Sequence, residues 1–205
     1  MRALLMAAAL LCAGATVQAQ GEMPDQVGNV PTEKFRKANE KGAQKVAEIK
    51  PDTDKASATD RELMERVAMG GMRQLLISQA VVARATNPTV KMLAQSEVDE
   101  QTGVSNKLKE IAAAAGVTLP AMPDATAQAI TKQVEALSGT ELDQLYLDES
   151  GVKGHEALQQ TMTTVSARAK NKALRKLAEA TLPVIKMHLE IAKAERAELN
   201  NGASR

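Results

Sequence analysis

The sequence predicts an all-α protein: a four-helix bundle with a short extra helix in the connector between the second and third helices. Apolar residues recur at alternating spacings of three and four over four long stretches, as expected for buried helix faces. The only aromatic side chains are Tyr146 and Phe35, so the core must be built from small and aliphatic residues. Such a core suits closely packed helices better than a sheet.

The first 19 residues have the pattern of a secretion signal. Arg2 gives a positive start, the run 4–15 is apolar, and Val17-Gln18-Ala19 places small residues at the cleavage-site spacing. The apolar run is shorter than the roughly 20 residues that a membrane-spanning helix needs. We therefore expect cleavage after Ala19 and a periplasmic or secreted mature chain without a transmembrane segment.

The charge balance bears on the class of partner. Loss of Arg2 leaves 25 of the 26 basic residues against 25 acidic ones. A chain without net charge lacks the basic face that nucleic-acid binding requires, and the scarcity of aromatic residues leaves no platform for stacked bases. We expect no nucleic-acid partner. A protein partner or a homo-oligomer stays open.

Polar composition sets the segment before the bundle apart. Residues 20–58 are broken up by prolines, and Gly42 interrupts their one stretch of helix-forming residues. We expect a polar tether there that is largely disordered or weakly helical, with Phe35 not docked. The helical bundle should then cover residues 59–199, followed by a disordered tail over 200–205.

The boundaries of the first two helices follow from capping signals. Thr59-x-x-Glu62 predicts a capping box at the start of the first helix. Asn87-Pro88 ends that helix and starts the second, because proline is well placed at a first helical position. Gly116 ends the second helix.

The connector and the last two helices come next. Residues 116–139 are long enough to travel the length of a bundle and contain a short helical pattern. The third helix is expected over residues 140–170 and the fourth over residues 172–199. Gly151 and Gly154 in the third helix indicate tight packing or a local bulge.

The two histidines of the chain fall at one height in the predicted bundle. His155 and His188 lie 16 and 17 residues from the turn at Asn171, and both fall on apolar stripes. Gln74 and Gln101 lie at similar distances from the turn that joins the first two helices. Because helices rise about 1.5 Å per residue, all four side chains should share a central layer.

A layer of this composition has two interpretations. Imidazoles with carboxylates can bind a divalent metal such as Zn, Cu, Fe or Ni inside a bundle. Alternatively, the polar groups satisfy one another and fix the register of the helices. Glu97 lies one turn away on the same stripe. The candidate metal ligands are His155, His188, Glu100, Asp148 and Glu195.

Complete catalytic motifs are absent from the sequence. The Glu-x-x-His signature of di-iron bundles fails, because Val152 and Ile185 stand three residues before the histidines. No Gly-x-Ser-x-Gly turn occurs either. We therefore expect neither a di-iron cofactor nor a catalytic set, and the identity of a divalent metal stays open.

Several short runs occur in an order and spacing that resemble one bacterial family, the secreted domain-of-unknown-function family 4142. The resemblance covers about residues 59–197. It implies a ferritin-like helical bundle exported to the periplasm or cell surface, and no known reaction. The runs are Gly70-Gly71-Met72, Asn87-Pro88, Ala115-Gly116-Val117-Thr118-Leu119-Pro120, Leu137-Ser138-Gly139, Gly154-His155-Glu156 and Thr181-Leu182-Pro183.

The chain also departs from the pattern of that family. Members commonly carry an Asp-His pair in the second helix and an acidic residue after the Gly-Gly pair, and this chain has Glu100-Gln101 and Gln74 there. Only His155 and His188 match the histidines of the family. We therefore expect an exported ferritin-like bundle that acts as a non-enzymatic envelope or stress-associated binding or structural protein. The alternative is a divalent-metal-binding protein that uses the layer of these two histidines.

Overall fold

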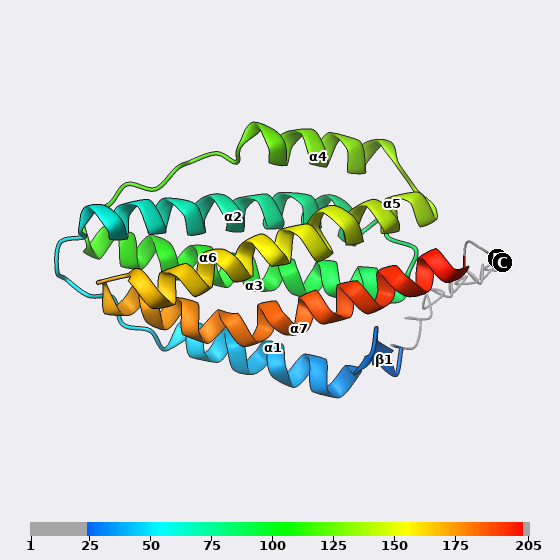
Figure 1. Ribbon diagram of the computed structural model, residues 1–205, viewed down its shortest axis with the longest axis horizontal. Coiled ribbons are helices and arrows are strands. Elements are labelled where there is room, and N and C mark those ends of the chain that lie inside the picture. Colours follow the sequence, from blue (N-terminus) through cyan, green and yellow to red (C-terminus); the bar gives the residue numbers. More distant parts are fainter. Residues whose placement is uncertain (1–23, 203–205) are drawn as a thin grey trace, which may run out of the picture.

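Long helices lie side by side in residues 24–202, the part of the chain that the computed structural model describes (Figure 1). A small hairpin of β1 (Gln26–Val27) and β2 (Val30–Pro31) precedes them. The helices are α1 (Thr32–Ala47), α2 (Ala58–Val82), α3 (Pro88–Ala114), α4 (Ala125–Ala136), α5 (Gly139–Tyr146), the π-helix η1 (Leu147–Gly154), α6 (His155–Arg168) and α7 (Lys172–Gly202).

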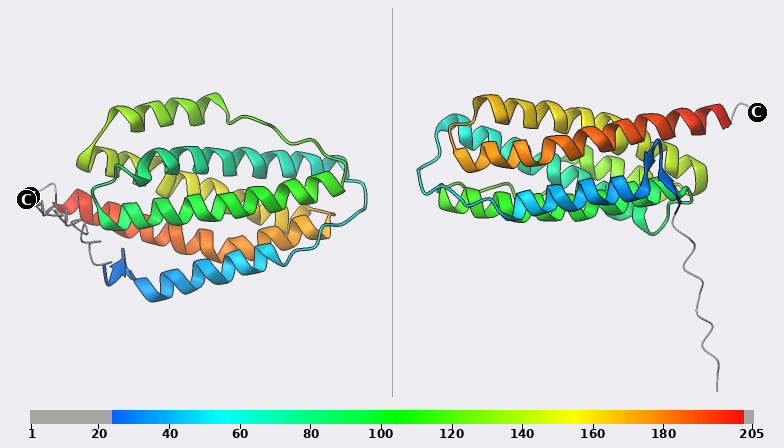
Figure 2. Two further views of the ribbon diagram at one scale, coloured as in Figure 1. Left: turned by 180° about the vertical axis from the view of Figure 1, so that it is seen from behind. Right: turned by 90° about the horizontal axis from the view of Figure 1, so that it is seen from below.

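The expected all-α bundle is confirmed. Helix α2 packs against α3, α6 packs against α7, and the two pairs lie against each other through α2–α6 and α3–α7 contacts (Figures 1 and 2). The predicted third helix is the continuous series α5, η1 and α6. The extra helix of the connector is α4, which covers the outer side of α2. None of the helices in residues 24–202 has the length and apolarity needed to cross a membrane.

Helix α1 corrects the expectation of a tether. It packs against α7 and α3, and Phe35 is 5% exposed (Figure 2). Its buried residues Phe35, Gly42 and Val46 are spaced by seven and four, so they share one face. Gly42 allows the close approach, because a Cβ atom there would lie 2.6 Å from Val184 Cγ2. The other end of the chain differs too: α7 continues to Gly202, into the expected disordered tail.

The start of α3 agrees with the sequence prediction, whereas the start of α2 differs from it. Asn87 caps α3, with its side-chain oxygen accepting from the Val90 amide at 3.1 Å, and Pro88 is the first helical residue. Helix α2 starts earlier than expected, because the capping box is made by Ser57 and Asp60. The expected cleavage site lies outside the described residues.

Polar residues divide the core along its length. Two apolar clusters fill the bundle, one toward each end. Along α7 the change from one cluster to the other occurs at His188, between Ile185 and Leu189. Along α2 it occurs around Gln74, which precedes Ile77. The predicted central layer therefore exists as a buried polar layer between two apolar halves.

Tight packing and a local irregularity both occur beside this layer. The chain forms the π-helix η1 immediately before His155. Within η1, a Cβ atom on Gly151 would come within 2.9 Å of the Ala192 methyl group. A Cβ atom on Gly154 would collide with the side-chain oxygen of Gln74. The two glycines thus let the wide turn approach its neighbours.

Candidate metal centre

Five buried polar side chains from four helical segments meet in the central layer. Each is at most 2% exposed, so the layer is closed to bulk water. The five residues are Gln74 from α2, Glu97 and Gln101 from α3, His155 at the start of α6 and His188 from α7.

Both imidazoles face the same carboxylate oxygen. His155 Nε2 lies 3.0 Å from Glu97 Oε2, and His188 Nδ1 lies 3.3 Å from the same atom. The two rings meet edge to face, with centroids 5.5 Å apart. The other oxygen of Glu97 accepts a hydrogen bond from Gln101 Nε2 at 3.0 Å. Glu97 is therefore the centre of the layer.

In each imidazole, the nitrogen that points away from Glu97 is the outer nitrogen, and it has a hydrogen-bond acceptor. His155 Nδ1 donates to the Ser150 carbonyl at 2.9 Å, a group that can only accept. His188 Nε2 donates to Asn39 Oδ1 at 2.9 Å. The amide of Asn39 is oriented for this role because its Nδ2 donates to the Phe35 carbonyl. Hydrogens on the outer nitrogens leave the inner nitrogens with lone pairs in the neutral rings.

The inner side of the layer therefore calls for positive charge. Two nitrogen lone pairs directed at one carboxylate oxygen repel it unless a proton or a metal ion lies between them. In a buried site this repulsion is weakly screened. The same second-shell arrangement, an outer imidazole N–H held by an oxygen, is what orients histidines that ligate metals.

Protons supply only part of that charge. Burial acts against the charged form of His155, but the adjacent Glu97 carboxylate outweighs it and raises the pKa of His155. Burial would likewise raise the pKa of Glu97, yet its interactions with His155 and His188 hold that pKa well below the usual range. For His188, burial lowers the pKa of the ring. A single proton held between His155 and Glu97 leaves the inner nitrogen of His188 without one.

Glu100 adds a second carboxylate next to that nitrogen. Its Oε2 lies 3.4 Å from His188 Nδ1, and its side chain is 11% exposed. Neither of its oxygens accepts a hydrogen bond from any residue that the structure describes. Burial and then repulsion from Glu97 raise the pKa of the Glu100 carboxyl well above its ordinary value. Burial thus favours the protonated form of Glu100 unless a cation joins its carboxylate.

The spacing of the donor atoms suits a small metal ion. One donor atom each from Glu97, His155 and His188 lie within 4.8 Å of one another. In a tetrahedral site with metal–ligand distances of about 2.0–2.1 Å, neighbouring donors are roughly 3.3–3.4 Å apart. The contacts of 3.0, 3.3 and 3.4 Å that join these residues and Glu100 are close to that value. Glu97, His155 and His188 thus form the ligand group, and Glu100 borders it beside His188 Nδ1.

The structure brings together three of the five ligands expected from the sequence: His155, His188 and Glu100. Asp148 lies elsewhere, paired with Arg196 Nε at 3.0 Å with both side chains more than 40% exposed. In a regular helix Asp148 would share a face with His155, seven residues later. The wider turns of η1 rotate it away.

Glu195 is on the expected stripe but at the wrong height. It accepts a hydrogen bond from Asn87 Nδ2 at 2.6 Å, at the turn between α2 and α3. Seven residues separate it from His188, which is about 10 Å along α7. The carboxylate that the layer uses instead is Glu97. The sequence did contain an indication of Glu97. This residue shares a helix face with Gln101 one turn away, and a glutamate side chain is long enough to span that turn.

The comparisons with known proteins identify a family and no function. Residues 45–194 match the family model described as "Domain of unknown function (DUF4142)". No curated protein matches the chain, and neither does any solved structure. The match begins near the end of α1, so Phe35 and Asn39, which contact His188, lie before it.

Proposed function

The chain belongs to the DUF4142 family, and we propose that it binds one divalent metal ion at the centre of its helical bundle. Glu97, His155 and His188 are the three ligands, and Glu100 takes the fourth position. The secretion signal expected from the sequence favours a role in the cell envelope. The proposed protein is an exported metal-binding bundle.

One observation carries this proposal. The inner nitrogens of His155 and His188 both face Glu97 Oε2, while their outer nitrogens donate to oxygens of Ser150 and Asn39. Such a ligand set, oriented and dehydrated before the ion arrives, needs a cation to balance it. Imidazole with carboxylate suits Zn²⁺, Fe²⁺, Ni²⁺ or Cu²⁺.

The closure of the site favours binding over catalysis. Glu97, His155 and His188 have no solvent exposure, and the proposal gives the fourth position to Glu100. Catalytic metal sites keep a position open for water or substrate, whereas a site with four protein ligands does not. We therefore expect metal storage, delivery or stabilisation of the bundle, without turnover.

The experiment is a Zn²⁺ titration of the mature protein after chelator treatment, followed by calorimetry. We expect one Zn²⁺ per chain and a raised melting temperature, because an ion bound only to the folded state stabilises it. His155→Ala and His188→Ala each remove a ligand and should weaken binding by more than the roughly 10–100-fold that loss of an outer-shell partner costs. Asp148→Ala is the matched control, since this acid lies at the surface and should leave the affinity unchanged.

The competing interpretation is a polar layer that only fixes helix register. It predicts no heat of binding and no thermal shift with Zn²⁺, Fe²⁺, Ni²⁺ or Cu²⁺. It also predicts that the histidine variants lose stability without losing any ligand. That combination of results would overturn the proposal.

A further inference from the structure

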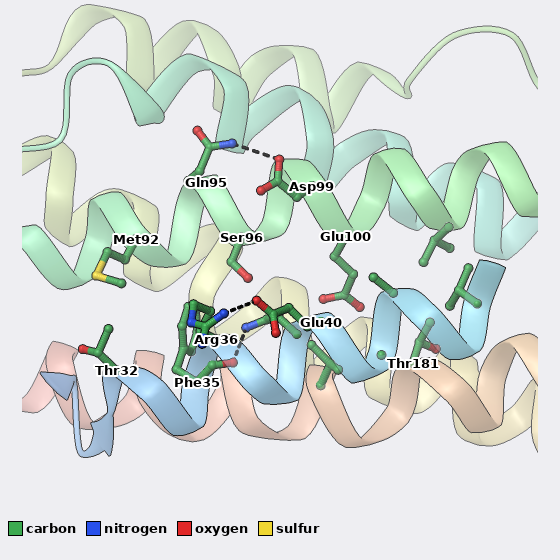
Figure 3. Close-up of a pocket in the computed structure, with 16 residues that line it drawn as sticks. Thr32, Phe35, Arg36, Glu40, Met92, Gln95, Ser96, Asp99, Glu100 and Thr181 are labelled. Atoms are coloured by element: carbon green, nitrogen blue, oxygen red, sulfur yellow. Dashed lines mark hydrogen bonds and ion pairs between the residues drawn. The ribbon is translucent and has the colours of Figure 1, made fainter. Parts of the chain in front are cut away.

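A pocket of about 510 Å³ runs between α1 and α3, and Glu100 is one of the residues that line it (Figure 3). This volume lies within the roughly 300–1,000 Å³ that is usual for small-molecule sites. Its walls are mainly apolar and belong to α1, α3 and α7. The side chains that form these walls are Phe35, Val46, Met92, Val104 and Val184.

Glu100 is the buried acid of this pocket, and its Oε2 lies 3.4 Å from His188 Nδ1. Figure 3 shows its carboxylate directed from α3 into the space facing α1. Both oxygens are buried, and no described residue donates a hydrogen bond to either. The neighbouring polar groups are already engaged: Thr181 Oγ1 donates to carbonyls of its own helix, and Asn39 joins Phe35 to His188.

The charges around the pocket select a cation. Glu40, Asp99 and Glu100 line it, and the one basic residue among the described lining residues is Arg36. Arg36 does not neutralise Glu100, because its guanidinium pairs with Glu33 at 2.9 Å and with Glu40. A buried carboxylate without hydrogen-bond donors in an apolar pocket complements a ligand with an apolar body and a positive end.

We propose that this pocket binds a primary aliphatic amine in its ammonium form, with the head on Glu100 and the alkyl chain along the apolar walls. An ammonium group supplies the hydrogen-bond donors that Glu100 lacks. The alkyl chain then occupies the space between the apolar walls. The ligand does not require the metal. It shares Glu100 with the fourth position of the metal centre, so amine and metal should weaken each other's binding reciprocally.

The test uses the mature chain treated with chelator and three probes of equal length: hexylamine, 1-hexanol and hexanoate. Calorimetry should show one hexylamine bound per chain, at least about tenfold more tightly than hexanol, because hydrogen bonds between charged groups are the stronger ones. Hexanoate should bind most weakly. Butylamine should bind roughly fourfold more weakly for each methylene removed.

Two variants test separately the contact of the ammonium group with Glu100 and the binding of the alkyl chain in the pocket. Glu100→Gln should abolish the preference for hexylamine over hexanol while keeping the binding of hexanol. Ala43→Phe fills the pocket from an exposed position on α1 and should remove binding of both probes. It should leave the Zn²⁺ affinity unchanged, so that failure of the amine site and failure of the metal site remain distinguishable.

Equal affinity of the wild-type chain for hexylamine and hexanol would overturn the proposal. So would a Glu100→Gln variant that is folded by circular dichroism and keeps the tenfold preference. If Glu100→Gln does not fold, the Ala43→Phe variant still decides, because undiminished hexylamine binding to a blocked pocket contradicts the proposed location.

Discussion

At the end of the bundle where α6 turns into α7, the carboxylate of Asp60 accepts four hydrogen bonds, whereas that of Glu100 in the middle accepts none from the described residues. The donors to Asp60 are the backbone amides of Lys170 and Asn171, at 2.7 and 3.1 Å, and the amide and hydroxyl of Ser57. Both carboxylates are buried, or nearly so. Only one has been supplied with partners by the fold.

The difference teaches what each carboxylate does. Buried acceptors with donors from the same chain stabilise a fold, because losing the group would leave several amides unpaired. A buried acceptor without donors destabilises the empty protein and gains its partner only from outside. Asp60 therefore has a structural role, and Glu100, with Glu97 beside it, has a ligand-binding one.

The largest effect should come from Asp60→Ala. Removal of the shared acceptor leaves the backbone amides of Lys170, Asn171 and Ser57 without a partner, and we expect the free energy of unfolding to fall by about 3 kcal/mol. Urea denaturation measures the change. Zn²⁺ affinity should stay the same, and a large loss of Zn²⁺ binding by the folded variant would break the distinction between the two regions.

The pH dependence of the same variant gives an independent check. Burial by itself would raise the pKa of Asp60, but the hydrogen bonds from Ser57, Asn171 and Lys170 lower it below the ordinary value. A lowered pKa in the folded state means that the stabilisation is present above about pH 4 and is lost as the pH falls through the folded-state pKa. The stability gap between wild type and Asp60→Ala should therefore narrow in acid.

Gly154→Ala should disturb the central layer itself. Its new methyl group would collide with the Gln74 side chain that borders His155, and we expect a loss of about 2 kcal/mol. The matched control is Gly103→Ala on α3, where a methyl group meets nothing within 4 Å. That control should gain about 0.5–1 kcal/mol from helix propensity. Equal effects of the two variants in urea denaturation would mean that the layer is loosely packed.

Asn39→Ala should weaken metal binding without removing a ligand. The amide of Asn39 holds the outer nitrogen of His188, and loss of such a partner reduces metal affinity by roughly 10–100-fold. Calorimetry with Zn²⁺ measures this. The control is Gln44→Ala, an exposed position on the same helix, which should leave the affinity intact.

Glu100→Met should give the smallest change in the free energy of unfolding, and the sign of that change is informative. The metal-free protein should become more stable by about 1 kcal/mol, because a buried carboxylate without donors is replaced by an apolar side chain of similar length. Zn²⁺ affinity should fall at the same time. A loss of stability in the metal-free variant, like that of Asp60→Ala, would place Glu100 in the structural class instead.

Much of the architecture could be predicted from the sequence because it depends on local signals. The Asn87-Pro88 start of α3 is a backbone property of two adjacent residues. The central layer followed from constant helical rise, which placed His155, His188 and Gln74 at one height.

The rest could not be predicted because it depends on tertiary packing. Helix α1 has only three buried residues, so its docking gives a faint pattern. The exclusion of Asp148 required knowledge of the π-helical turn before His155. Asn39 was invisible as a partner of His188, because the two lie 149 positions apart and no periodicity links them.

Anomalous diffraction from crystals of the mature protein grown with Zn²⁺ tests the central claim most directly. We expect one peak in the bundle centre, about 2.0–2.2 Å from His155 Nε2, His188 Nδ1 and a Glu97 oxygen. A central layer that keeps its His155–Glu97 hydrogen bond, with no peak or with Zn²⁺ only at surface residues, would contradict it.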